Sequence, residues 1–300
     1  RIFIHHGIIL MILYPGVMQI NPPIKKHLGV GKTSVAYIEM GDPAGMPVLL
    51  LHGYPNHSFL WRNVMKGMAA FRCLAPDLMG LGDTEPAPDA DLSLESQAKM
   101  VKGFLEAMKI KRAALVGHDH GGGVAQIIAV KWQESVSHLI LVDSVGYDAW
   151  PVARVRARAW MARFLPGLSS SPLLMERFWR SRFGLSQAVN NPSVMTPDIL
   201  EEYIRPLTSS PERRERFRRY LVSCSSKATN EIAEKLRSLS LPAMVVWGEH
   251  DRFLPISIGQ RLCQDIPACR LEIVQGCGHL VPEEMPDALA TLICGFLSPS

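Results

Sequence analysis

Short apolar runs that end in glycine or aspartate alternate with segments of helical periodicity through most of this chain. The runs "VLLLHG" (48–53), "AALVGHD" (113–119) and "HLILVDS" (138–144) are apolar at nearly every position, so they suit strands buried on both faces. Amphipathic segments lie between them. This alternation predicts an α/β class domain with a mostly parallel, doubly wound sheet, in which ligands bind at the carboxyl ends of the strands.

The alternation breaks between residues 145 and 228, where the pattern is helical with several prolines and carries fourteen Lys and Arg against seven Asp and Glu. We interpret this region as a helical cap inserted over the strand ends. The core would then comprise residues 25–144 and 229–300. Within the core, "LSLESQAKMVKGFLEAM" predicts an amphipathic helix capped by Ser93. Residues 1–24 are expected to form an arm outside the core.

Composition excludes several function classes. The chain has 300 residues and a net charge of only +4, so we expect no nucleic-acid partner. The apolar run 8–14 is too short to cross a bilayer, and no membrane partner is expected. Six cysteines without a C-x-x-C pair indicate free thiols, a cytoplasmic location and no metal site. The segment "GVGKTS" lacks the first glycine of a phosphate-binding loop, since Lys26 stands there, and no cofactor is predicted.

The stretch "GHDHG" (117–121) predicts a sharp strand-to-helix turn with Asp119 at its tip. Glycines on both sides allow close backbone approach, and the helix N-terminus stabilises an anion. Many hydrolases carry serine at this position. A serine needs a base to become a nucleophile, whereas an ionised carboxylate does not. Asp119 is therefore expected to attack saturated carbon and form an ester that water must then cleave.

Two further strand ends provide the groups that the second step needs. His279 follows the run "RLEIVQGCG" and is the expected base that activates water. Asp251, in "WGEHD", would orient the His279 ring, and Asp143 is the rival for that role. The backbone N–H groups of Tyr54, in "HGYP", and of His120 are the expected oxyanion hole.

Taken together, "HGYP", "GHDHGG", "WGEHD" and "GCGH" resemble the α/β-hydrolase superfamily over about residues 30–298. Among its members they are similar to the group with an aspartate nucleophile, which contains epoxide hydrolases, haloalkane dehalogenases and haloacetate dehalogenases. The resemblance implies an α/β-hydrolase fold and the order nucleophile, acid, histidine that Asp119, Asp251 and His279 follow.

The resemblance also implies groups that assist the leaving atom. Epoxide hydrolases use two cap tyrosines, and the cap offers Tyr147, Tyr203 and Tyr220, of which the last two are our candidates. Haloalkane dehalogenases usually place a tryptophan after the nucleophile, where this chain has His120, although Trp150 could donate an N–H instead. Haloacetate dehalogenases carry an arginine at the position of His120, which counts against substrates that bear a carboxylate.

The sequence therefore predicts a hydrolase that forms an alkyl-enzyme ester on an aspartate and most readily opens epoxides to diols. Haloalkane or haloacetate dehalogenation with the same triad is the alternative, and a catalytically inactive relative that binds a small ligand is a second one. The expected partner is a small-molecule substrate, and a homodimer is left open.

Overall fold

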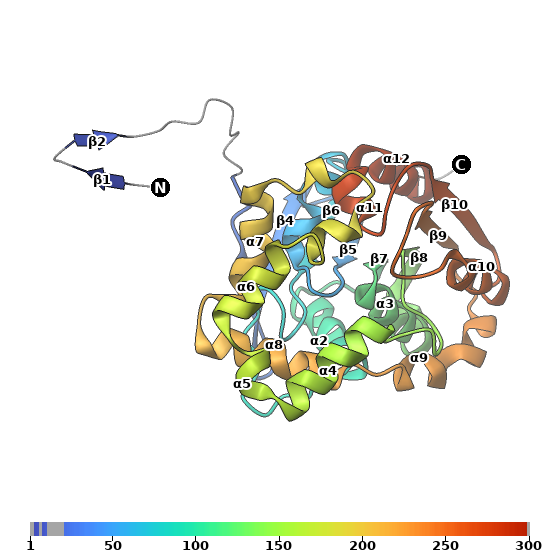
Figure 1. The fold of residues 1–300 in the computed structure, drawn as a ribbon. Helices are drawn as coiled ribbons and strands as arrows, with labels where there is room; N and C mark the ends of the chain where they lie inside the picture. Colours follow the sequence, from blue (N-terminus) through green and yellow to red (C-terminus); the bar gives the residue numbers. More distant parts are fainter. Residues whose placement is uncertain (1–2, 6–7, 11–20, 299–300) are drawn as a thin grey trace.

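A computed structural model describes residues 3–5, 8–10 and 21–298 (Figure 1). One eight-stranded sheet organises the domain, in the order β10-β9-β8-β7-β5-β6-β4-β3. The strands from β10 to β6 run parallel, and β4 and β3 are antiparallel at one edge. The predicted mostly parallel sheet is confirmed. Its strands are β3 (Lys26–Val30), β4 (Thr33–Gly41), β5 (Pro47–Leu51), β6 (Arg72–Pro76), β7 (Ala113–His118), β8 (Val136–Val142), β9 (Ala243–Gly248) and β10 (Cys269–Val274).

The central strands are apolar throughout because helices cover the sheet. All residues of β7 and β9 are buried, which matches the absence of alternation in their sequences. The segment "GVGKTS" contains the tight turn between β3 and β4, and this hairpin explains why it forms no phosphate loop. The short strands β1 (Phe3–His5) and β2 (Ile8–Leu10) pair with each other in a separate antiparallel ribbon.

Helices follow the strands as the pattern predicts. The hydroxyl oxygen of Ser93 accepts a hydrogen bond from the N–H of Ser96, which confirms the predicted cap. Helix α3 contacts both α2 and α9, and α1, α11 and α12 contact one another. The core helices are α1 (Arg62–Lys66), α2 (Leu94–Ala107), α3 (His120–Lys131), α9 (Lys227–Ile232), α10 (Ile256–Asp265), α11 (Val281–Glu284) and α12 (Pro286–Leu297).

Five helices between β8 and β9 lie over the ends of the strands (Figure 1). They are α4 (Ala153–Phe164), α5 (Pro166–Ser169), α6 (Pro172–Arg180), α7 (Pro197–Thr208) and α8 (Pro211–Ser223). Arginine side chains of α8 fasten this layer to the core: Arg213 and Arg216 donate to the backbone carbonyls of Gly82 and Thr84. Among the described residues, no helix combines the length and the apolar character that crossing a bilayer requires.

Candidate active site

Asp119 occupies the tip of the turn between β7 and α3. Its backbone adopts φ 51° and ψ −119°, a left-handed conformation that is strained for a residue with a side chain. The strain is held in place by packing: a Cβ atom on Gly117 or on Gly121 would collide with backbone atoms of the turn or of β5. The turn therefore requires glycine on both sides and presents the carboxylate of Asp119 above the sheet.

The two oxygens of the Asp119 carboxylate have different neighbours. Oδ1 accepts a hydrogen bond of 2.9 Å from the backbone N–H of Tyr54. Oδ2 lies 3.6 Å from Nε2 of His279. Asp119 is only 8% exposed, so these contacts take place largely away from bulk water. The N–H of Tyr54 is thus positioned on the reacting carboxylate, as an oxyanion hole requires.

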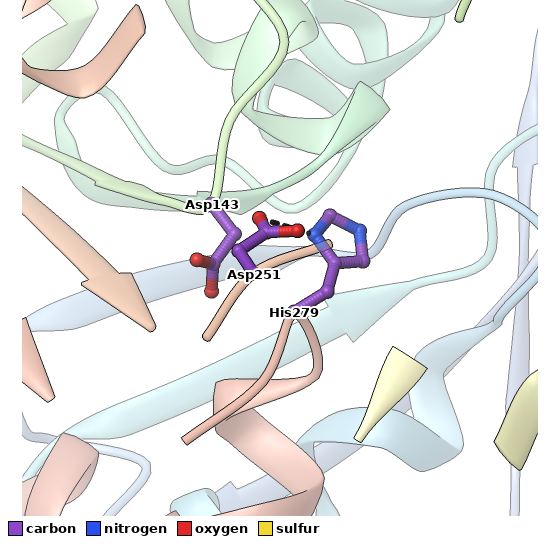
Figure 2. Close-up of side chains that lie close together, drawn as sticks. All are labelled: Asp143, Asp251 and His279. Carbon is purple, nitrogen blue, oxygen red and sulfur yellow. Dashed lines mark hydrogen bonds and ion pairs between the residues drawn. The ribbon is translucent and has the colours of Figure 1, made fainter. Parts of the chain in front are cut away.

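His279 and Asp251 converge on this carboxylate from the loops that follow β10 and β9. The Nδ1 atom of His279 and Oδ2 of Asp251 are 2.8 Å apart, and Figure 2 shows this contact as a dashed line. The other oxygen of Asp251 accepts the backbone N–H groups of Phe253 and Leu254, at 2.7 and 3.0 Å. These two bonds fix the carboxylate, which in turn holds the imidazole with Nε2 toward Asp119.

Asp143, the rival acid, lies behind Asp251 rather than against the imidazole ring (Figure 2). It is fully buried at the end of β8, and its Oδ1 accepts the N–H of Gly248 at 2.8 Å. Burial, reinforced by the nearby charge of Asp251, raises the pKa of Asp143 well above its ordinary value. The hydrogen bond to His279 therefore favours Asp251 as the orienting group.

Asp143, Asp251 and His279 also have the chemistry of a cation site, because one donor atom from each lies within 4.8 Å of the others. The donors are already engaged, however. Asp251 accepts two backbone N–H groups and contacts the His279 ring, and Asp143 accepts the N–H of Gly248. This arrangement suits proton handling better than metal binding, and we assign no metal to it.

The electrostatics of the site suit a charged nucleophile. Burial opposes ionisation of Asp119, but the imidazoles of His120 and His279 outweigh it and hold the pKa of Asp119 below its ordinary value. Burial also opposes protonation of His279, yet the carboxylates of Asp251 and Asp119 raise its pKa well above 6.5. The resting site therefore pairs a carboxylate with an imidazolium. Ester formation would remove the charge of Asp119 and so lower the pKa of His279, which frees the base for the second step.

We expect Asp119→Asn to lower the pKa of His279. The substitution removes one of the two negative charges that stabilise the imidazolium, so deprotonation should occur at lower pH than in the wild type. Nitrogen-15 NMR titration of the histidine side chains measures this change, and the signal lost in His279→Gln assigns the resonance. Glu106→Gln, on the exposed face of α2, is the matched control and should leave the pKa of His279 unchanged. An unchanged or higher pKa in Asp119→Asn would contradict the ion pair.

The side chain of His120, the first residue of α3, lies between Tyr220 and Asp119. The role of its backbone N–H in the oxyanion hole stays a prediction. The Nδ1 atom of His120 lies 2.6 Å from the hydroxyl oxygen of Tyr220, and its Nε2 atom lies 4.0 Å from Oδ1 of Asp119. Burial lowers the pKa of His120, so the ring is neutral at neutral pH. A phenol has one proton to donate, and we therefore assign the Tyr220 proton to Nδ1 and the imidazole proton to Nε2. This N–H then faces the nucleophile.

Three of the aromatic candidates for the leaving group are engaged elsewhere. The hydroxyl of Tyr147 donates to Asp265, at 2.8 Å, and the hydroxyl of Tyr203 donates to Glu283, at 2.6 Å. Trp150 lines the cavity above Asp119, but its indole N–H donates to Thr229 at 2.9 Å. The expectation that Tyr203 and Trp150 present a donor to the substrate is therefore corrected. Of these four candidates in the described chain, Tyr220 reaches the site, because its hydroxyl contacts Nδ1 of His120.

A cavity of about 50 Å³ lies above Asp119, between the strand ends and the cap. Three polar residues that the sequence analysis did not single out line it: Asn56, Arg154 and Arg158. The amide of Asn56 is fully buried and has no hydrogen-bond partner among the described residues. Arg158 donates to the hydroxyl of Tyr54 at 3.2 Å. Asn56 stands two residues after Tyr54, and that spacing was the one signal in the sequence that pointed to it.

Comparison with known proteins identifies the family to which the chain belongs. The profile described as "alpha/beta hydrolase fold" matches residues 46–286, so the chain belongs to the α/β-hydrolase family. It is a hydrolase of that family by its relatives as well.

Two relatives and one solved structure indicate how far the similarity extends. "Uncharacterized hydrolase YugF" of Bacillus subtilis is 28% identical, with 93% of this chain and all of that protein covered. A "2-hydroxy-6-oxononadienedioate/2-hydroxy-6-oxononatrienedioate hydrolase" of Paraburkholderia phymatum is 27% identical over 83% of this chain and 86% of its own. An α/β-hydrolase fold protein from Burkholderia ambifaria has a TM-score of 0.78 at 27% identity, covering 91% of this chain and all of that one.

Proposed function

We propose that this hydrolase works through a covalent ester between Asp119 and a saturated carbon of its substrate. The observation that carries the proposal is the position of Asp119 between the N–H of Tyr54 and Nε2 of His279, whose ring Asp251 holds. A carboxylate at this turn needs no activation to attack carbon, while His279 is placed to activate the water that cleaves the ester.

Epoxide opening is the reaction that we propose first. Ring opening leaves an alkoxide, which needs a proton as well as a hydrogen bond. The pair Tyr220–His120 supports both, because His120 can give its Nε2 proton to the alkoxide while Nδ1 takes the proton of Tyr220. Hydrolysis of the ester to carboxylate and alcohol releases one proton, which restores the phenol of Tyr220 for the next turnover. One cap tyrosine would thus act through a histidine, in place of two tyrosines that face the substrate directly.

Dehalogenation is the second candidate, and one observation favours it. The N–H of the neutral His120 ring faces the nucleophile, and a departing halide requires a hydrogen-bond donor but no proton. His120 would then donate a hydrogen bond to a departing halide, just as it would donate to an alkoxide. The two reactions differ in their need for the Tyr220 proton.

A single turnover in heavy-oxygen water, with enzyme in excess over a styrene-oxide-type epoxide or a brominated alkane, tests the covalent route. The ester mechanism transfers an unlabelled Asp119 oxygen to the product and leaves the heavy oxygen on the protein. Direct attack by water would instead label the product at once and would contradict the proposal. Binding without any turnover of either substrate would support the ligand-binding alternative.

Tyr220→Phe is expected to slow epoxide opening on the order of 10²-fold and bromide release less than about threefold. The variant keeps the packing of the ring but removes the proton that reaches the alkoxide through His120. Steady-state assays of diol and of bromide on the same preparation measure the difference. Tyr203→Phe is the matched control, because its hydroxyl contacts Glu283 away from the cavity, and it should leave both rates similar. Equal losses on both substrates in Tyr220→Phe would argue against the relay.

A further inference from the structure

Large apolar side chains are exposed mainly on one part of the cap. Among the described residues, seven of the eleven exposed large hydrophobic side chains belong to residues 160–183. Trp160, Phe164 and Phe183 are 58%, 60% and 57% exposed. Such a concentration is unusual for a surface that faces only water and marks an interaction site. The seven are Trp160, Phe164, Leu165, Leu168, Leu173, Leu174 and Phe183.

The same segment is strongly basic. Residues 153–183 contain seven arginines and one glutamate, a net charge of +6. One face of α4 carries four exposed side chains. Counted from Arg156, the others stand four, seven and eight residues further on, at Trp160, Arg163 and Phe164. Neither Arg156 nor Arg163 forms an ion pair with a carboxylate of the described chain.

An apolar groove lies beside the cavity above Asp119 and shares lining residues with it. Its volume is about 280 Å³, and its lining includes Leu168 and Leu174 from the exposed set. Arg158 and Trp179 line both this groove and the cavity above Asp119. Exposed Phe183 also lines that cavity. Helices α4, α5 and α6 follow one another along this side of the cap (Figure 1).

We propose that helices α4–α6 dock onto the surface of a lipid bilayer that contains anionic lipids. Tryptophan, phenylalanine and leucine enter the interface between headgroups and acyl chains, and arginine is attracted to the negative surface. Docking of this kind needs no helix that spans the bilayer. It would place the groove, and with it the entrance to the cavity, against the lipid phase, so that apolar substrates reach the site from the bilayer.

Charge favours an anionic bilayer over a second copy of the chain as the partner of this surface. A symmetric dimer through α4–α6 would bring two surfaces of net charge +6 against each other, and like charges disfavour that contact. An anionic bilayer offers the opposite charge. Docking goes beyond the proposed ester chemistry and does not depend on it.

Co-sedimentation of the full chain with vesicles tests the proposal. Vesicles of phosphatidylcholine are compared with vesicles in which about a third of the lipid is phosphatidylglycerol, and we expect at least about tenfold tighter binding to the second. The triple variant Arg156→Glu, Arg163→Glu, Arg177→Glu should lose this difference, and Trp160→Ala with Phe164→Ala should weaken binding to both kinds. The control Lys32→Glu, Lys66→Glu, Lys111→Glu makes the same charge change at exposed positions outside the cap and should bind like the wild type.

Three outcomes would overturn the proposal. The wild type could fail to distinguish the two vesicles, the lysine control could lose binding as strongly as the arginine triple, or sedimentation could show a dimer that Phe164→Asp dissolves. Turnover of a soluble substrate, measured in parallel on the arginine triple, should equal that of the wild type. If the protein binds vesicles but the product of the first turnover carries heavy oxygen, the docking proposal stands and only the ester mechanism is refuted.

Discussion

Asp119→Asn is expected to reduce turnover on the order of 10⁴-fold or more while the fold is retained. Asparagine has the shape of aspartate, and its carbonyl oxygen can still accept the N–H of Tyr54, so the strained turn keeps its hydrogen bond. The amide carries no negative charge and is a poor nucleophile, so the first step fails. Rates of diol or halide formation measure the loss, and circular dichroism with thermal unfolding checks that the fold persists.

Asp143→Asn is the matched control for this experiment. It also exchanges a buried carboxyl group for an amide at a strand end, but burial raises the pKa of Asp143, and its Oδ1 accepts the backbone N–H of Gly248. We expect its turnover to remain within about tenfold of the wild type. Near-normal activity of Asp119→Asn, or an equal loss in Asp143→Asn, would place the nucleophile elsewhere.

The second large effect is expected in His279→Gln, which should form the ester and then retain it. The first step needs no base, because the carboxylate of Asp119 attacks without one, whereas the second needs a base for water, and a missing general base typically slows a step by about 10²–10⁴-fold. With a brominated alkane, about one bromide per enzyme should be released while almost no alcohol appears, and the protein should then carry one substrate unit. Intact-protein mass spectrometry should detect this adduct, and peptide mapping should locate it on Asp119.

His250→Gln tests whether loss of a histidine alone has this effect. His250 precedes Asp251, is about half exposed, and contacts Glu249 rather than the triad. It should show normal turnover and no adduct. Normal turnover of His279→Gln would show that the assignment of His279 as the base is wrong. Binding of substrate without any adduct would show that the covalent route is wrong.

The strand ends could be predicted from sequence because buried parallel strands carry a local signature. Runs such as "AALVGHD" (113–119) are uniformly apolar and stop abruptly at a polar residue, so the position of Asp119 above the sheet follows from the run itself. Asp251 and His279 lie in the loops that follow the neighbouring strands β9 and β10. Parallel strands deliver their carboxyl ends to one edge, which is why residues 132 or more positions from Asp119 meet it.

The direction of cap side chains could not be predicted in this way. Tyr203 is fully buried against Glu283, which follows β10 by several residues and also pairs with Arg62 of α1. Glu283 stands 80 residues from Tyr203 and 221 residues from Arg62 in the sequence. Helical periodicity contains no information about contacts between such distant segments. The side chain of His120 was missed for a similar reason, since its role depends on Tyr220, which lies 100 residues away.

The unequal surroundings of the two Asp119 oxygens have a stereochemical consequence. Oδ1 is held by the N–H of Tyr54, so Oδ2 is the atom free to approach carbon, from the side opposite the departing group. In the proposed mechanism, water directed by His279 would then attack the carboxyl carbon of Asp119 and leave the new bond between Oδ2 and the substrate intact. A chiral centre would be inverted once and never restored, so each enantiomer of the starting material should emerge as alcohol of opposite handedness.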